Sequence, residues 1–187
     1  MLMYWADEVE LYNGTQLRSL HSYMRWGLLG DSIVAWRGPC NVPLSHMVDG
    51  EDARAKSAIR GDDMVHFIVE LFAKDLVFAV AMQRLMASHA QSLIREIVGD
   101  QGPYLSRSGD DLYVGERKLS ISVATKSPVS SLIHFALNVV NDGTPVPTIS
   151  LSDFSVDPKD FASELMARIV DEYHSIVQAT CKVFAVP

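Results

Sequence analysis

The sequence predicts an α+β fold, in which a mixed, mainly antiparallel sheet has helices packed on one face. Three observations support this class: a tight hairpin pattern, two long amphipathic helical patterns, and several short apolar runs rich in β-branched residues. Strand pairs covered by helices form one of the common layered architectures. The 187 residues contain no internal repeat and no Pro/Gly/Ser-rich linker, so we expect one domain over residues 1–187.

The hairpin is the clearest β signal in the chain. Residues 111–114 and 117–125 read as strands and are separated by Gly115-Glu116, with glycine at the first position of a two-residue turn. Further strands are expected at residues 9–12, 32–36, 64–72 and 131–140, with a candidate edge strand at 181–186. The polar segment 41–62 is either a functional loop or contains a short helix.

Two long helices are predicted from apolar residues at helical spacing. The first begins after Asp75, whose carboxylate can cap the free N–H groups, and it ends at Gly99. The second has Asp157 as its cap and Pro158 as its first residue, a position that favours proline. Each helix has one apolar stripe, which we expect to pack on the sheet.

Charge and cysteine content limit the classes of partner. The net charge is −7 and the pI is about 5.3. Binding to bulk nucleic acid needs an excess of Lys and Arg and is not expected, although a local pocket for one phosphate or carboxylate is compatible with this balance. No apolar stretch reaches the ~20 residues that span a bilayer, and the N-terminus lacks the features of a signal peptide. Two cysteines far apart in sequence fit a reducing compartment, so we expect a cytoplasmic location and no membrane partner.

Alternation along the strands gathers a set of polar side chains. The residues expected on one face of the hairpin are Asp111, Tyr113, Lys118, Ser120 and Ser122, and those expected on one face of the strand at 131–140 are His134 and Asn138. The opposite face, against the helices, is expected to carry Leu119, Ile121 and Val123. A cation, a carboxylate and an imidazole together can orient a carboxylate or phosphate and move a proton. A simple solvated sheet face is the alternative.

A second group of candidates lies before the polar segment. Cys40 follows Arg37 where a strand leads into a loop, and a nearby Arg favours the reactive thiolate, whereas a packed, inert thiol is the alternative. The six histidines and two cysteines lack the short spacing of metal ligands, so no metal centre is expected. The acidic residues at 49–52 either hold Mg²⁺ for nucleotide chemistry or form a solvated loop.

Several long motifs carry a resemblance to a known family. The sequence Arg-Ser-Gly-Asp-Asp-Leu-Tyr-Val-Gly-Glu-Arg-Lys-Leu-Ser-Ile-Ser-Val-Ala-Thr at 107–125 resembles proteins grouped as domain of unknown function 366. So do Gly-Asp-Ser-Ile-Val-Ala-Trp-Arg-Gly-Pro-Cys at 30–40 and the segments at 64–70 and 127–135. This family has no established activity, and the resemblance implies the fold of biotin and lipoate protein ligases, related to class II aminoacyl-tRNA synthetase cores.

The same hairpin is similar to the ligase motif in which an Asn-Asp pair opens one strand and Gly-x-Lys-Ile-x-Gly opens the next. The resemblance places Asp110 and Asp111 near the Asp position and Lys118 at the lysine, which in the ligases binds the acyl-adenylate or the substrate carboxylate. His134 falls where lipoate ligases often have a histidine. Ile121 replaces a glycine of the motif and could close the substrate tunnel, and Arg54 is a loose substitute for the missing glycine-rich arginine segment.

These expectations combine into one functional hypothesis with an alternative. The chain would bind a small carboxylate or acyl-nucleotide for acyl transfer or adenylation, with Lys118 as the electrostatic contact and Asp111 and His134 orienting groups or moving protons. The candidate ligand-binding residues are Arg37, Cys40, Arg54, Ser120 and Asn138. ATP with Mg²⁺ is the cofactor compatible with this chemistry. The alternative is a non-catalytic small-molecule-binding or assembly module on the same fold, and a homodimer is left open.

Overall fold

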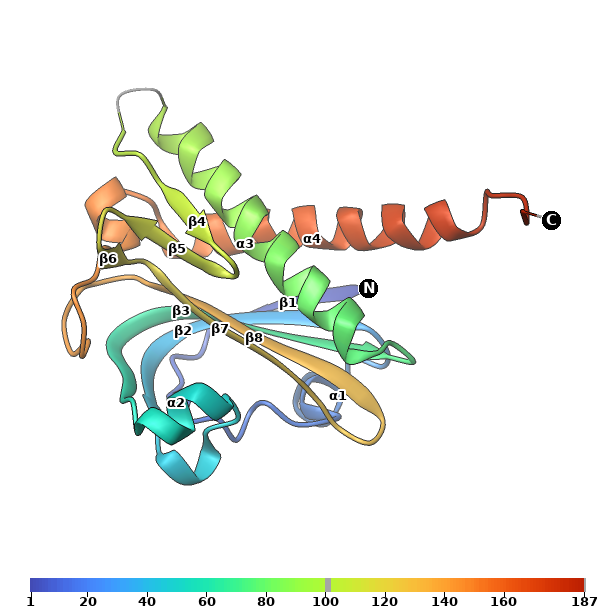
Figure 1. Cartoon of the computed structure of the whole chain (residues 1–187), viewed down its shortest axis with the longest axis horizontal. Helices are drawn as coiled ribbons and strands as arrows, with labels where there is room; N and C mark the ends of the chain where they lie inside the picture. The colour runs from blue at the N-terminus through green and yellow to red at the C-terminus, as the bar shows by residue number, and fades with distance from the viewer. Residues whose placement is uncertain (100–101, 187) are drawn as a thin grey trace.

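The computed structural model describes residues 1–99 and 102–186, and it consists of two sheets and two long helices (Figure 1). Helices α3 (Leu76–Val98) and α4 (Pro158–Thr180) lie on one side of the larger sheet, whereas the short helices α1 (His21–Trp26) and α2 (Gly50–Ala55) lie on the other side. Both predicted long helices are therefore confirmed, with Asp75 and Asp157 capping their first N–H groups. No helix in the described ranges has the length and hydropathy needed to cross a membrane.

The larger sheet has five strands in the order β1-β2-β3-β8-β7. Their bounds are β1 (Leu2–Ala6), β2 (Ser32–Val42), β3 (Ile59–Phe72), β7 (Ser120–Lys126) and β8 (Ser130–Asn138). Only the β1–β2 pair is parallel, and the other neighbours are antiparallel. The prediction of a mixed, mainly antiparallel sheet is thus confirmed.

Side-chain alternation divides the core into two clusters, one on each face of this sheet. Phe67 and Phe135 face α3 and α4 in the larger cluster. Trp36, Met64 and Ala136 face the opposite side, where they pack against the segment that precedes α1. Because β3 and β8 are buried on both faces, their sequences read as nearly continuous apolar runs.

The smaller sheet contains the predicted hairpin. Strands β4 (Ser106–Ser108), β5 (Asp111–Val114) and β6 (Arg117–Lys118) pair in that order. Lys118 pairs with Tyr113 across the turn, as expected, and Gly115 adopts the positive φ of 59° that glycine permits at low cost. The second strand of the hairpin is shorter than predicted, because the chain leaves this sheet after Lys118 and enters β7 of the larger sheet at Ser120.

This change of sheet at Leu119 reverses part of the predicted pattern of faces. Val123 pairs with His134, and Ile121 with Ala136, so both lie on the α2 side of the sheet and not against the long helices as predicted. Ser122 lies instead on the helix side, opposite Phe135. Alternation holds only within one continuous strand, and Lys118 and Ser120 belong to different sheets.

Other predicted elements shift or disappear. Residues 9–12 form no strand, since only Tyr12 makes an isolated bridge, to Cys40. Residues 181–186 also form no strand. The segment 41–62 contains helix α2 and the 3-10 turn Leu44–His46, which confirms the short-helix alternative. A second 3-10 turn, Leu151–Phe154, precedes α4.

Candidate functional site

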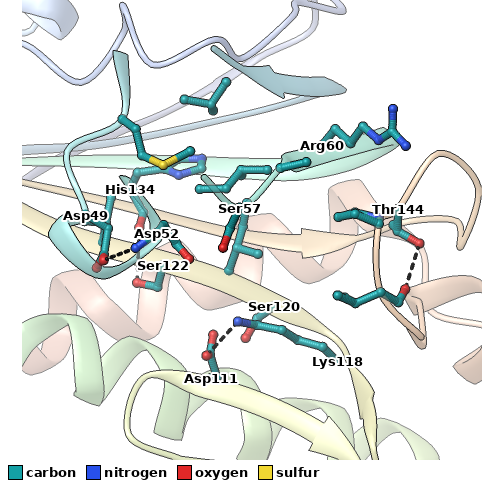
Figure 2. A pocket seen from close by; sticks show the side chains of 18 of the residues that line it. Asp49, Asp52, Ser57, Arg60, Asp111, Lys118, Ser120, Ser122, His134 and Thr144 are labelled. Carbon is teal, nitrogen blue, oxygen red and sulfur yellow. Dashed lines mark hydrogen bonds and ion pairs between the residues drawn. The ribbon is translucent and has the colours of Figure 1, made fainter. Parts of the chain in front are cut away.

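A pocket of about 450 Å³ lies on the α2 side of the larger sheet, at its β7 edge. Its walls come from α2 with its flanking segments, from the end of the small sheet, from strands β7 and β8, and from the loop at 144–148. This volume falls in the range of typical small-molecule sites. Figure 2 shows Lys118 and Asp111 on one wall, with the carboxylates of Asp49 and Asp52 on the wall that α2 supplies.

Lys118 and Asp111 form an ion pair on the pocket wall. Lys118 Nζ lies 2.7 Å from Asp111 Oδ2, and each side chain is about one quarter exposed. Burial raises the pKa of Asp111, and the hydrogen bond from Lys118 acts in the opposite direction. The predicted meeting of this ammonium and this carboxylate over a hollow is therefore present in the structure.

The backbone of Lys118 is fixed on both sides. Its N–H donates to Pro147 O at 3.0 Å, and its carbonyl accepts from the Ile149 N–H at 3.1 Å. The Asn138 side-chain amide donates to the same carbonyl at 3.1 Å and to Ile149 O at 3.3 Å. Asn138, predicted as a ligand contact, thus positions the short strand that carries the ammonium group.

Helix α3 holds the wall beside this pair through Gln83. Gln83 Nε2 lies 2.7 Å from Asp110 Oδ2 and 2.8 Å from Ser122 Oγ. The Ser120 hydroxyl, predicted as a ligand contact, accepts a hydrogen bond from the Leu112 N–H at 2.9 Å and is fully buried. Both serines line the pocket, but their hydroxyls are already used: that of Ser120 joins the two sheets, and that of Ser122 accepts from Gln83 and donates to His134 O.

His134 lies at the inner side of the pocket as part of a buried pair. His134 Nε2 is 3.1 Å from His66 Nδ1, and His66 Nε2 is 3.1 Å from Gly38 O. The Tyr12 ring stacks on His134 with centroids 3.6 Å apart and an interplanar angle of 11°. Burial lowers the pKa of His66 to about 4 and that of His134 well below its ordinary value, so both rings are neutral at pH 7.

The charged lining is predominantly acidic. The charged lining residues are Asp49, Glu51, Asp52, Arg60, Asp110, Asp111 and Lys118. Five carboxylates therefore face two cations, and Lys118 is already paired with Asp111. Arg60 points away from Lys118 in Figure 2. Across residues 1–99 and 102–186, no group of three or more His, Cys, Asp or Glu side chains is arranged to hold a metal ion.

Three predicted site residues lie apart from this pocket. Arg37 pairs with Asp63, with two hydrogen bonds of 2.9 and 3.0 Å from its Nε. Cys40 is buried within β2, and burial raises the pKa of its thiol to about 12. Arg54 is an exposed side chain on α2, outside the lining set. The structure thus unites Lys118, Asp111, His134, Ser120 and Asn138 and separates the other three.

The sequence interpretation missed several residues that shape the pocket. Tyr12 and Arg60 line it, whereas His66 and Gln83 support it from behind. Alternation along β3 could have identified His66, because His66 lies on the same face of the sheet as His134 of the neighbouring strand β8. No local pattern marks Tyr12, which reaches the sheet through one isolated bridge.

Comparison with known proteins places the chain in a family. The model of domain of unknown function 366 (DUF366) matches residues 1–184. The chain belongs to the DUF366 family. An uncharacterized protein of Methanocaldococcus jannaschii, MJ0805, is 33% identical to this DUF366 chain over 155 residues, which cover 80% of this chain and 68% of that protein. A protein of unknown function from Pyrococcus horikoshi is 40% identical over 100% of this chain and 99% of its own, with a TM-score of 0.92.

More distant structures share the fold of this DUF366 chain. The biotin protein ligase of Aquifex aeolicus, in complex with biotin and ATP, has a TM-score of 0.61 at 13% identity and covers 91% of this chain and 69% of its own. Ta0514 from T. acidophilum, a candidate lipoate protein ligase with bound lipoic acid, has a TM-score of 0.52 at 16% identity over 91% and 84%. The expected biotin/lipoate ligase-like fold is confirmed.

Proposed function

We propose that the pocket binds a small organic carboxylate, with the Lys118 ammonium as its charged contact. The observation that carries this proposal is the position of Lys118: its Nζ reaches the wall of a 450 Å³ hollow, and its backbone is fixed by bonds to Pro147 and Ile149. An ammonium group held in advance loses little conformational entropy when a carboxylate arrives. Similar folds solved with biotin or lipoic acid support the same class of ligand.

Asp111 and His134 have supporting roles in this proposal. Asp111 shares the Lys118 ammonium and keeps it directed along the wall, so an incoming carboxylate joins an existing hydrogen-bonded pair. His134 is neutral at pH 7 because burial lowers its pKa, so it acts as a hydrogen-bonding group and not as a general acid or base. The expected role of His134 in moving protons is therefore replaced by one in orienting the ligand.

The pocket does not fit a bare polyphosphate. Two cations stand against five carboxylates on its walls, and like charges at short range repel each other. We therefore include no nucleotide step in the proposal. A carboxylate activated elsewhere, as in acyl transfer, is compatible with the residues present.

Calorimetric titration with biotin, lipoate and octanoate tests this proposal. We expect at least one of the three to bind, and Lys118→Ala to weaken its binding by about tenfold or more, because a hydrogen bond to a charged group is lost. The control is Arg117→Ala, which removes an exposed cation from the adjacent residue of β6 and should leave binding unchanged. Failure of all three compounds to bind, or an unaffected Lys118→Ala variant, would contradict the proposal.

A non-catalytic binding module is the second candidate. The Ile121 side chain on the pocket wall, where the ligase motif has glycine, favours this function, as does the acidic lining. A release assay separates the two candidates. Release of the thiol from a thioester of the bound carboxylate would indicate an acyl-transfer enzyme, whereas carboxylate binding without release would indicate a module.

A further inference from the structure

A chain of hydrogen bonds runs from the backbone of β2 into the pocket through two histidines. It links Gly38 O to His66 Nε2, and His66 Nδ1 to His134 Nε2, with 3.1 Å at each step. Strands β2, β3 and β8 each contribute one member, so the order of strands in the sheet fixes the chain. This arrangement determines which nitrogen of each ring carries hydrogen.

The carbonyl group of Gly38 determines the first hydrogen position. Gly38 O can only accept, so His66 Nε2 carries the hydrogen of that bond. His66 is neutral because burial lowers its pKa to about 4, so its Nδ1 has a lone pair. That lone pair faces His134 Nε2, which must therefore donate. Since His134 is also neutral, its remaining nitrogen, Nδ1, can only accept.

This remaining nitrogen is available to a ligand. In the described part of the chain no hydrogen bond reaches His134 Nδ1. The fully buried side-chain atoms that lack a partner there are His21 Nε2, Ser22 Oγ and Ser32 Oγ. His134 Nδ1 also lacks a partner but is not among them, so it is not sealed from solvent. His134 lines the pocket, and the stacked Tyr12 ring holds its plane.

We infer that the pocket selects a carboxylate that also carries an N–H or O–H donor, and that His134 Nδ1 accepts its hydrogen. The inference rests on the proposed contact of the carboxylate with Lys118 and adds a second point of recognition on β8. His66 is a positioning residue, since it fixes the tautomer of His134 without lining the pocket. A wholly apolar chain would leave this acceptor desolvated and unpaired, at a cost of roughly tenfold in affinity or more.

The tautomer can be measured without any ligand. Long-range ¹⁵N–¹H correlation spectra of the labelled protein at neutral pH should show both His66 and His134 protonated on Nε2 alone. Hydrogen on His134 Nδ1, on both of its nitrogens, or exchange between the two tautomers would overturn the inference. This measurement does not depend on Lys118 or on the choice of compound.

Biotin and lipoate provide a matched pair for the binding test. Each has a pentanoate tail on a sulfur-containing ring, but biotin carries urea N–H donors and lipoate carries none. We expect the affinity for biotin to exceed that for lipoate by about tenfold or more. Equal binding, or a preference for lipoate, would overturn the inference and leave the proposed function standing. If neither of these compounds nor octanoate binds, the proposed function fails, and the tautomer measurement alone decides the acceptor role. Binding of octanoate alone would overturn the inference.

Variants of the buried histidine give a third readout. His66→Gln replaces the ring with an amide that can present either oxygen or nitrogen to His134, so the preference for biotin should fall while lipoate binding changes little. His89→Gln, on α3 and outside the pocket, is the matched control and should keep the full preference. An undiminished preference in a folded His66→Gln variant would contradict the role of His66. If this variant fails to fold, the two measurements on the unmodified protein decide.

Discussion

Cys40 and Cys181 carry the same side chain in opposite environments. Cys40 is buried within β2, whereas Cys181 is exposed at the end of α4. Burial raises the pKa of Cys40 to about 12, so the reactive thiolate is absent at neutral pH. Arg37, which suggested activation, is instead paired with Asp63. The structure favours the packed thiol over the nucleophile.

Thiol labelling should separate these two cysteines. With maleimide at neutral pH, we expect one fast reaction in the native protein and a second only after unfolding. Cys181→Ser should abolish the fast reaction, and Cys40→Ser should preserve it. A fast reaction that persists in Cys181→Ser would show that Cys40 is accessible and ionised.

At the scale of elements, strand β2 is irregular at the point where the N-terminal segment contacts the sheet. The register between β2 and β3 shifts between Gly38 and Cys40. A Cβ atom on residue 38 would lie 2.1 Å from Glu10 O, so only glycine permits this close approach. Tyr12, two residues after Glu10, is thereby held against His134.

Gly38→Ala should therefore destabilise the fold. We expect a loss of about 2 kcal/mol or more in the free energy of unfolding, because the backbone near Glu10 has to move. Urea denaturation would measure it. Gly50→Ala is the control, since nothing lies within 4 Å of an added Cβ there. Equal stabilities for the two variants would contradict the role of the close approach.

The predictions from sequence succeeded where local rules apply. The capped ends of α3 and α4 and the turn at Gly115 depend on nearby residues, and all three were predicted. The faces of Ile121 and Val123 were wrong, because the change of sheet at Leu119 depends on which strands meet in space. Alternation correctly placed Lys118 next to Asp111, because both residues belong to the small sheet. It placed Ser122 on the wrong face, because Ser122 belongs to the large sheet.

At the scale of the whole molecule, the unpredicted parts are contacts between distant segments. Tyr12 and His134 are 122 residues apart in sequence, yet their rings stack. Arg37 and Arg54 were selected for their charge, but charge does not show which cavity a side chain reaches. The family resemblance supplied the fold and the lysine, and the acidic lining and the histidine pair emerged only from the arrangement of both sheets.

Stability should fall as the pH drops below about 6.5. Burial lowers the pKa of His66 and of His21 to about 4, so the unfolded chain binds protons before the folded chain does. The stabilisation is complete above the unfolded pKa and is lost progressively as the pH falls toward 4. For His66 alone we expect about 2 kcal/mol less stability at about pH 5 than at pH 7. Urea denaturation at several pH values would show it, and a His66→Gln variant with an equally steep dependence would contradict it.

Leu119 is the single residue of chain between the small sheet, which ends at Lys118, and the large sheet, which resumes at Ser120. Lys118 belongs to the small sheet and His134 to the large one, so a ligand that touches both spans the junction between the two sheets. The preferred length of such a ligand then depends on the spacing between the two sheets. A substitution that tilts one sheet against the other would change the preferred chain length without altering either contacting side chain.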